Sequence, residues 1–581
     1  MSDQATDSSS LARLRAFLRP HWPAALGLLV LVGAALWPLP RLLLTATDAV
    51  GQEVGDLADH YWGTWWFGGE LLSGRLPGAT DLVQYPGEVR LWYVDPLGAL
   101  IGLLLRPLGY PGAYNAMVLA QAMFAALAAY AVGVWASGSR AAGFVAGAVA
   151  GASPYMLGLV HSGLSEYFGL GFPVLFTGAL ISAMGLDPRG RPPVRGAPWI
   201  AGALLAACAA QAFYYVAFGG LLTICAVVGP GWRGRVRTAA QIAVVSGVLA
   251  APLFIAAWLT LSSPDAAVTQ ENAPGWAYKA LPATDLLTFF RPGEYYFPDT
   301  RATNPGILHV NYLGWVALAL AGLGLLRVRA EASAARLLGP MAATYLIFSL
   351  GPRLCVGGKL LSWGAGAVPL PLALLYVPGS PFRFVHHPYR MVAFAIPVLA
   401  VLAAVGALAL PRAVRVAVGA LIALEAMVVS PAAWPLASTP VEAPEAYAAL
   451  PDGPILDWPP DATTWNRRYL LWQVTHRHPI AYGVNTFLPD EVLHDPLVQR
   501  LLRELTSPDL RARNRDVAPS GRVLVNARGG TSRLHEMGYR LVALHTKAVT
   551  IGELDRATSI LNAQYGQVFL NQDTMMVWKT R

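Results

Sequence analysis

The apolar run PAALGLLVLVGAALWPLPRLLL, residues 23–44, sets the fold class of this chain. It matches the ~20 residues that a helix needs to cross the ~30 Å hydrocarbon core of a bilayer. Arginines precede it at positions 13, 15 and 19, and no small-residue cleavage site follows it at the distance typical of a signal peptide. The run therefore predicts a first membrane helix that starts in the cytoplasm, preceded by a cytoplasmic segment of residues 1–22.

The composition extends this prediction to most of the chain. Of 581 residues, 55% are hydrophobic and 13% are charged, and the mean hydropathy is +0.45. A soluble protein usually carries about 25% charged residues, so the composition excludes a soluble enzyme. The three cysteines are far apart and form neither a disulfide framework nor a CxxC metal site. The net charge of +8 comes from arginines between apolar segments, as membrane topology requires, and predicts no nucleic-acid partner.

The distribution of charge divides the chain in two. Residues 438–581 contain 31 charged residues, whereas the preceding 437 residues contain only 45. This predicts a transmembrane domain over residues 23–437 and a soluble domain over residues 438–581. In the second part, short strands at 454–458, 540–545, 568–570 and 575–579 accompany polar helices at 490–503 and 551–562, a pattern typical of a small α/β domain. That domain could bind the acceptor, cover the active site or serve as a scaffold.

The arginine-rich loops predict the topology of the membrane domain. Residues 187–195, 232–237, 327–336 and 412–415 should be cytoplasmic. The chain has twelve apolar segments, and all four loops are cytoplasmic only if one early segment does not span the membrane. The short segment of residues 96–108 is the best candidate, as an interfacial or re-entrant helix. We therefore expect an α-helical polytopic protein with about eleven spans. Residues 45–111 form its first extracytoplasmic loop, and residues 438–581 lie outside as well.

The first outer loop carries the strongest chemical pattern, GDLADHYWGTWWFGGELLSGRLP at residues 55–77. On a helix, Asp56, Asp59 and His60 would share one face. Such a group can act as a general base on a hydroxyl, or it can bind a divalent cation such as Mg²⁺ or Mn²⁺. A solvated acidic loop is the alternative. The tryptophans that follow suit a helix at the level of the lipid headgroups.

Four other ionisable residues are candidates for an outer pocket. His161 and Glu166 fall where one predicted span ends and the next begins, and a charge at membrane depth usually faces a wet cavity or the bundle interior. Glu166 could instead cap a helix. Glu88 and Asp95 lie in the stretch YPGEVRLWYVDPLG and could be further carboxylates of the site or simple turn residues.

A second outer segment, residues 378–394 (PGSPFRFVHHPYRMVAF), combines Arg383, His386, His387 and Arg390 without an acid. Excess cation on the outer side opposes the usual charge bias. A lipid phosphate would account for it, because arginine matches phosphate oxygens in a bidentate way. The alternative is that these cations form salt bridges to the acidic first loop. A phosphate site and such salt bridges are compatible if the two segments face one cavity.

Several stretches together resemble the GT-C superfamily of membrane glycosyltransferases, in particular the bacterial branch that includes YfhO-like proteins. The matching motifs run over most of the chain: GDLADHYWGTWW (55–66), YPGEVRLWYVDPLG (85–98), AYN (113–115), GSRAAGFVAGAVAGASPYMLGLVH (138–161), FRFVHHPYRM (382–391), GPILDWPP (453–460), YLLWQVTHRHPIAYG (469–483) and LHEMGYRLVALH (534–545).

The resemblance implies an inverting transferase that moves a sugar from a polyprenyl-phosphate donor to a glycan, lipid or protein on the outer face of the bacterial cytoplasmic membrane. By motif position Asp56 looks like the catalytic acidic residue of this branch, with Asp59 and His60 as its neighbours and Asp48 as its rival. The sequence lacks the adjacent Asp-Glu pair of the protein mannosyltransferases. It also lacks the WWD-type motif of the oligosaccharyltransferases, which disfavours peptide asparagine as acceptor.

Three other functions stay open at this point. An O-antigen ligase or polymerase would also use outer arginines and a lipid-linked sugar. A transporter or flippase of lipid-linked glycans should show ionisable groups at mid-membrane and an internal repeat, and the sequence shows little of the first and no clear second. A non-catalytic scaffold for envelope assembly is the third.

Overall fold

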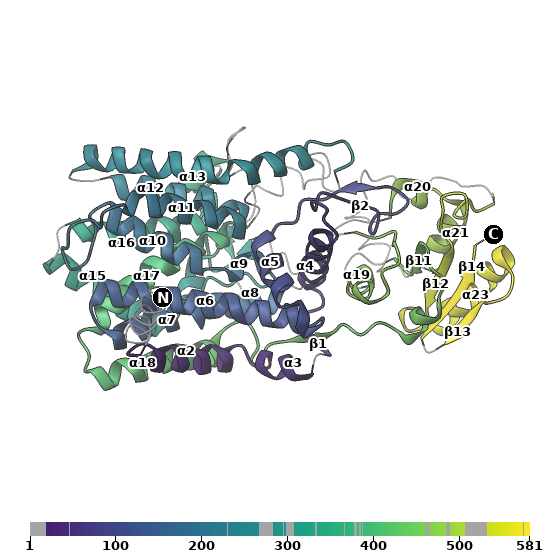
Figure 1. Ribbon diagram of the computed structural model, residues 1–581, viewed down its shortest axis with the longest axis horizontal. Helices are drawn as coiled ribbons and strands as arrows, with labels where there is room; N and C mark the ends of the chain where they lie inside the picture. Colours follow the sequence, from purple (N-terminus) through teal and green to yellow (C-terminus); the bar gives the residue numbers. More distant parts are fainter. Residues whose placement is uncertain are drawn as a thin grey trace, which may run out of the picture. The chain divides into compact units, whose positions relative to one another are not determined.

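The computed structural model shows a mostly helical protein with small sheets (Figure 1). It describes residues 19–45, 47–228, 231–266, 283–293, 296–297, 307–331, 334–364, 366–376, 380, 382, 385, 387–460, 465–483, 488–505, 531–572 and 574–580. The chain forms two compact units. The helical unit comprises residues 1–45, 115–253 and 275–437, and the mixed unit comprises residues 46–114, 254–274 and 438–581.

Apolar helices make up most of the helical unit. They are α2 (Trp22–Ala35), α3 (Leu39–Thr45), α6 (Gly112–Ser137), α7 (Arg140–Gly151), α8 (Pro154–Ser162), α9 (Ser165–Phe168), α10 (Gly171–Ala183), α11 (Ala197–Gln211), α12 (Phe213–Val227), α13 (Trp232–Leu261), α15 (Trp315–Glu331), α16 (Leu338–Ser349), α17 (Val392–Ala407) and α18 (Arg412–Val429). Serine side chains fix two of the starts: Ser139 and Ser153 accept hydrogen bonds from backbone N–H groups in the first turns of α7 and α8.

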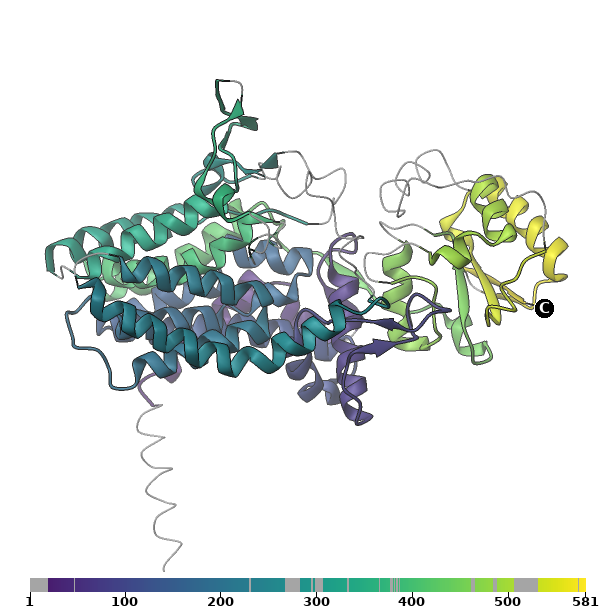
Figure 2. The same ribbon diagram turned by 90° about the horizontal axis from the view of Figure 1, so that it is seen from above.

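Short antiparallel strand pairs interrupt the helices in the described part of this unit. Strand β4 (Ala283–Thr284) pairs with β5 (Tyr296–Phe297), and two further hairpins follow. In one, β6 (Cys355–Val356) pairs with β7 (Lys359–Leu360), and in the other, β8 (Ser362–Trp363) pairs with β9 (Gly366–Ala367). Figure 2 shows them projecting from the helix bundle.

In the part of the chain that the structure describes, five helical stretches can cross a membrane by length and composition: Gly112–Ser137, Arg140–Ser162, Ser165–Ala183, Trp232–Leu261 and Pro388–Ala407. The pair formed by α2 and α3, bent by 85° at its break, makes a sixth. Three further apolar helices are shorter than a full span. The protein is therefore an integral membrane protein, whereas the number of eleven spans stays a prediction.

Helix α17 forms the centre of the helical unit. All of its residues are buried, and it packs against α7, α10, α15 and α16. Its approach to α15 is closest at two glycines. A Cβ atom added to Gly406 would lie 1.9 Å from the carbonyl oxygen of Leu320, and one added to Gly324 would lie 1.9 Å from that of Leu402. Small residues let membrane helices approach backbone to backbone, so these glycines set the distance between the two helices.

Replacing Gly406 by alanine should therefore destabilise the protein, by roughly 1–3 kcal/mol if the helices separate to accept the methyl group. The thermal unfolding midpoint in detergent measures this effect. Gly322→Ala is the matched control, because Gly322 lies on α15 with nothing within 4 Å of its added Cβ. Equal midpoints for the two variants would contradict the close packing of α15 and α17.

Helix α15 starts later than the apolar pattern predicts. The pattern begins at residue 306, but the helix begins at Trp315, after a segment without regular secondary structure at 307–314. The carboxylate of Glu425, on α18, accepts hydrogen bonds from the backbone N–H groups of Trp315 and Val316 and from the Tyr312 hydroxyl. A carboxylate at a helix N-terminus satisfies its free N–H groups and suits its dipole, so Glu425 fixes where α15 begins.

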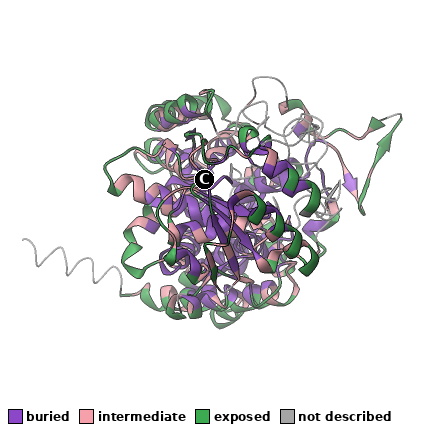
Figure 3. Ribbon diagram, turned by 90° about the vertical axis from the view of Figure 1, so that its right-hand side faces the viewer, coloured by how far each residue is buried: buried purple, intermediate pink, exposed green. Residues whose placement is uncertain are grey.

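The last part of the mixed unit is a small α/β domain, as predicted. Its sheet has the order β11-β12-β14-β13, with β11 (Ile455–Trp458) parallel to β12 (Leu541–His545), and with β14 (Met575–Lys579) antiparallel to both β12 and β13 (Leu570–Gln572). Helices α20 (Asp490–Leu493), α21 (Pro496–Leu505) and α23 (Ile551–Tyr565) accompany it, and a Thr550–Glu553 capping box starts α23. Figure 3 shows the strands buried and the outward helix faces exposed.

The first loop of the chain lies in the same unit as this domain. Strand β1 (Asp48–Val50) pairs antiparallel with β10 (Ser438–Pro440), which leads into the domain. Helix α4 (Leu57–Leu72) packs on α19 (Trp465–His476) and on α5 (Pro96–Leu104). Helix α5 has nine residues and measures roughly 14 Å at 1.5 Å per residue, which is too short to cross a bilayer.

Candidate functional site

Asp56 lies at the N-terminal end of α4 in the mixed unit. The His60 N–H donates to the Asp56 carbonyl over 3.1 Å, which closes the first turn of the helix. The Asp56 side chain makes no capping hydrogen bond and is 18% exposed. Its carboxylate lies 3.8 Å from a guanidinium nitrogen of Arg467, on α19. The carboxylate is thus held on a regular element, beside a cation, and part of it remains accessible.

Asp59 and His60 follow on the first turn of α4, and both are buried. The Tyr93 ring lies 6.3 Å from the His60 ring, and the Tyr93 hydroxyl donates to the His60 carbonyl over 3.0 Å. The same hydroxyl lies 2.9 Å from the hydroxyl of Thr64. Of the three residues predicted as a catalytic group, Asp56 is therefore the most accessible to a substrate.

The expected role of the tryptophans on α4 is wrong for two of them. Trp62 and Trp66 are buried and stack on each other with ring centres 5.5 Å apart. The Trp62 indole N–H donates to the side-chain oxygen of Gln473, on α19, over 2.6 Å. They pack inside the mixed unit because α19, distant in the sequence, covers this face of α4. They are not headgroup anchors.

The other carboxylates of the first loop have different surroundings. Asp48 lies on β1 and accepts a hydrogen bond from the Ser438 hydroxyl over 3.0 Å. Asp95 is fully buried and caps α5 by accepting from the Gly98 N–H over 2.7 Å, which is the turn role that the sequence also allowed. Glu88 is exposed, beside β3 (Val89–Arg90).

The second group of predicted residues lies in the helical unit, around Arg390. Arg390 belongs to the short helix η7 (Pro388–Met391) and is 8% exposed. Its guanidinium donates to the Tyr167 hydroxyl over 2.7 Å and lies 4.4 Å from the centre of the Tyr167 ring. Glu166 is the neighbour of Tyr167 on α9, and it interacts electrostatically with the Arg390 guanidinium. A phenol and a carboxylate thus hold this buried cation in place.

Histidine and tyrosine rings extend this group, which we call the arginine cluster (Tyr155, Glu166, Tyr167, His309, His387, Tyr389 and Arg390). The His309 ring lies 5.0 Å from the His387 ring and 4.7 Å from the Tyr389 ring. The Tyr155 hydroxyl donates to the Arg390 carbonyl over 3.4 Å. Sequence reasoning missed His309, Tyr155 and Tyr167, and only the motif ILHVNYL at residues 307–313, polar within an apolar run, could have indicated His309.

The remaining predicted residues of this group are placed as follows. Arg383 and His386 lie outside the described residues. His161 is half-buried in the last turn of α8. Next to it, the Ser162 hydroxyl accepts from the Leu308 N–H over 3.0 Å, so the end of α8 touches the segment that carries His309. The structure thus brings Glu166, His387 and Arg390 into one cluster.

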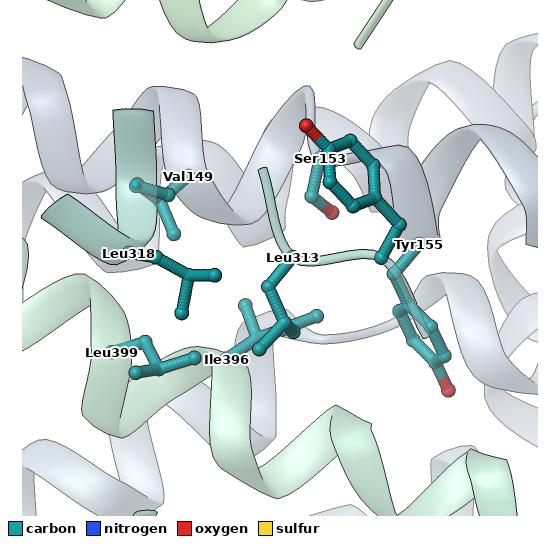
Figure 4. Close-up of a pocket in the computed structure, with 9 residues that line it drawn as sticks. Val149, Ser153, Tyr155, Leu313, Leu318, Ile396 and Leu399 are labelled. Carbon is teal, nitrogen blue, oxygen red and sulfur yellow. The ribbon is translucent and has the colours of Figure 1, made fainter. Parts of the chain in front are cut away.

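An apolar pocket lies in the same unit, between α7, α8, α15 and α17 (Figure 4). Its lining residues are Val149, Ser153, Tyr155, Tyr312, Leu313, Ala317, Leu318, Ile396 and Leu399. Because Tyr155 both lines the pocket and bonds to the Arg390 backbone, the pocket adjoins the arginine cluster.

The α/β domain contains a third polar group that the sequence did not reveal. Asp457 on β11 is fully buried, and its carboxylate lies 3.0 Å from the His545 imidazole and accepts from the Tyr447 hydroxyl over 2.6 Å. The ring of His476 stacks on that of Tyr447 with centres 4.2 Å apart. Burial, with a smaller effect of the Asp457 charge, raises the pKa of Tyr447. This network holds β11, β12 and α19 together.

The His476 imidazole makes the stability of the protein depend on pH. Burial lowers the pKa of His476 to about 3; His478 and His545 lower it further, and Asp457 opposes them. In the unfolded chain the group takes up a proton near pH 6.5. Between pH 6.5 and 3 the unfolded state therefore binds more protons, and stability should fall as the pH falls through this range.

The expected result is a thermal unfolding midpoint that drops between pH 7.5 and 4.5, with a smaller drop for His476→Gln. The control is His494→Gln, which removes an exposed histidine at the end of α20. A pH dependence that is the same in His476→Gln and in the wild type would contradict this role.

Among the residues that the structure describes, no group of three or more His, Cys, Asp or Glu side chains is arranged to hold a metal ion. A divalent cation at the acidic first loop stays a prediction.

Comparison with known proteins finds similarity in structure. No family model matches the chain, and no curated protein matches it significantly. Structures of ArnT from Cupriavidus metallidurans are similar over nearly the whole length of both chains. The apo form has a TM-score of 0.47 at 14% identity and covers 96% of this chain and 98% of that one. The form bound to undecaprenyl phosphate has a TM-score of 0.45 at 12% identity and covers 97% and 98%.

A second similar structure is the archaeal oligosaccharyltransferase AglB from Archaeoglobus fulgidus, in complex with an inhibitory peptide and a dolichol-phosphate. It has a TM-score of 0.47 at 12% identity, and the match covers 95% of this chain and 72% of that one.

Proposed function

We propose that the protein is a membrane glycosyltransferase that moves a sugar from a polyprenyl-phosphate donor to an acceptor of the bacterial cell envelope, on the extracytoplasmic face of the cytoplasmic membrane. The observation that carries the proposal is the buried Arg390. Among the described residues, its Nε–H has no hydrogen-bond partner. A buried N–H without a partner costs about 1–3 kcal/mol, and a bound anion would supply the missing acceptor.

The arginine cluster suits a phosphate group. The hydrogen bond to Tyr167 engages one nitrogen of the guanidinium, and Nε–H remains for a phosphate oxygen. The charge of the guanidinium stabilises the negative charge that develops on the leaving phosphate, and this is worth most where water is excluded. The histidines of the cluster add further polar groups around that position.

The apolar pocket suits the lipid part of the same donor. Its walls are aliphatic except for Ser153 and two tyrosines, and it adjoins the arginine cluster through Tyr155. The pocket is small, so an isoprenoid chain would enter it only if the lining side chains move apart. A phosphate beside Arg390 and a chain leading into the pocket would together account for both features.

Asp56 acts in this mechanism as the general base. As the acceptor hydroxyl oxygen attacks the anomeric carbon, its proton passes to the Asp56 carboxylate. The bond between the anomeric carbon and the phosphate oxygen breaks, and polyprenyl phosphate leaves with the bonding electrons. A single displacement of this kind inverts the anomeric configuration. A positioned base contributes about 10²–10⁴-fold to such a step.

Comparative analysis of envelope glycans and lipids tests the function. Cells that lack the gene should lose one envelope sugar and accumulate the corresponding lipid-linked donor, and the wild-type gene should restore both. An unchanged envelope in cells without the gene would contradict the proposal.

Purified protein in detergent distinguishes a transferase from a flippase, because transfer needs no sealed membrane whereas flipping does. Incubation with a lipid extract that contains polyprenyl-linked sugars should yield free polyprenyl phosphate and a glycosylated acceptor. If the protein relocates the donor in sealed vesicles but never cleaves it, the transporter is the better explanation.

A further inference from the structure

Helix α19 of the α/β domain contacts the acidic segment of the first loop, which we define as residues 53–60. Gln473 accepts from Trp62, and its amide donates to the carbonyl groups of Leu82 and His478. Arg468 forms an ion pair with Glu53 that is partly exposed. Arg467, one residue before, makes the contacts nearest to Asp56.

The guanidinium of Arg467 joins three acceptors of the acidic segment. One of its terminal nitrogens donates to the backbone carbonyl groups of Val54 and Gly55. The other lies 3.8 Å from the Asp56 carboxylate. The Arg467 side chain is only 12% exposed, so solvent screens these contacts much less than it screens a surface ion pair. The planar fork of an arginine can span several acceptors in this way, and the single ammonium group of a lysine cannot.

We infer that Arg467 is a positioning residue that holds the backbone before Asp56 and orients its carboxylate for proton transfer. The inference rests on the proposed function, since it assigns a task to Asp56. A base works only within hydrogen-bond distance of the proton it takes, and a misplacement of about 1 Å can cost about 10²-fold in rate. The α/β domain is then a part of the catalytic apparatus, because its helix α19 supplies the residue that fixes the base.

Two substitutions separate charge from geometry. Arg467→Gln removes the charge and the fork, whereas Arg467→Lys keeps a charge but cannot reach all three acceptors. We expect kcat to fall about 10- to 100-fold in Arg467→Gln and less in Arg467→Lys, with the KM values of donor and acceptor within about threefold of the wild type. The matched control is Arg500→Gln, which breaks an exposed ion pair with Glu504 on α21 in the same unit.

Hydrogen exchange provides a readout that needs no substrate. In Arg467→Gln, amides of residues 53–60 should exchange at least about tenfold faster, while the rest of the protein and its thermal midpoint stay unchanged. Arg500→Gln should leave these amides as they are in the wild type.

The two measurements distinguish failure of this inference from failure of the proposed function. Unchanged exchange of residues 53–60 in Arg467→Gln would overturn the role of Arg467, whatever the activity. So would faster exchange with an unchanged kcat in an active protein. A wild-type protein without transfer activity would overturn the proposed function, and with it the assignment of Asp56 as a base. Faster exchange, a lower kcat and unchanged KM values together would support the inference.

Discussion

Asp56→Asn should reduce sugar transfer by about 10²–10⁴-fold while the protein still folds. Asparagine keeps the shape of the side chain but cannot accept the proton of the acceptor hydroxyl. Asp56 is partly exposed, and no capping hydrogen bond of its side chain is lost. The measurement is kcat for transfer in detergent, together with the restoration of envelope glycans in cells that lack the gene.

The other carboxylates of the first loop serve as comparisons for this variant. Asp81→Asn alters an exposed residue of the same loop and should leave transfer unchanged. Asp48→Asn replaces the charged acceptor of the Ser438 hydroxyl by a neutral amide and should affect stability more than kcat. Full activity of Asp56→Asn, with loss of activity in Asp48→Asn or Asp59→Asn, would move the assignment of the base to that residue.

Arg390→Ala is expected to weaken use of the donor by roughly 30-fold or more in kcat/KM. Removing one partner of a buried, hydrogen-bonded charge contact typically costs 2–5 kcal/mol. Arg390→Lys should retain part of the effect, because a lysine keeps the charge but loses the planar contact with Tyr167. The measurement is initial rate against donor concentration at saturating acceptor.

Because Arg390 is buried, a milder variant keeps this prediction testable. Tyr167→Phe removes only the hydroxyl that accepts from Arg390, and it should lower kcat/KM for the donor by less than Arg390→Ala does. Arg412→Ala changes an exposed arginine at the start of α18 and serves as control. If folded Arg390→Ala protein depends on donor concentration as the wild type does, Arg390 is not part of a phosphate site.

The fold class could be predicted because its signals are local. Apolar runs of membrane length and the sudden rise in charge after residue 437 both follow from the sequence within short windows. In the α/β domain, the strand at Met575–Lys579 has its predicted bounds, and the other three lie within two residues of theirs. The start of α15 could not be predicted, because it depends on Glu425, a residue of another helix.

The sequence predicted several residues of the candidate site, but it did not predict the contacts between them. Glu166 and Arg390 were singled out from separate segments, and the structure brings them together. Arg467 and Tyr167 carried no local signal, because each acts on a residue more than 200 positions away. Burial of Trp62 likewise depends on Gln473, 411 positions later. That the acidic segment and the arginine cluster serve one pocket stays a prediction.

The pairing of β1 with β10 constrains how the protein is made. Ser438 and Asp48, which meet in this pairing, are 390 positions apart. At about 5–20 residues per second, the ribosome needs roughly 20–80 s to add the second strand after the first. During this time β1 and the acidic segment have left the ribosome without their partner strand and without α19. Their folding therefore has to wait until the rest of the chain has been inserted, and biogenesis should be the step most sensitive to loss of the last 144 residues.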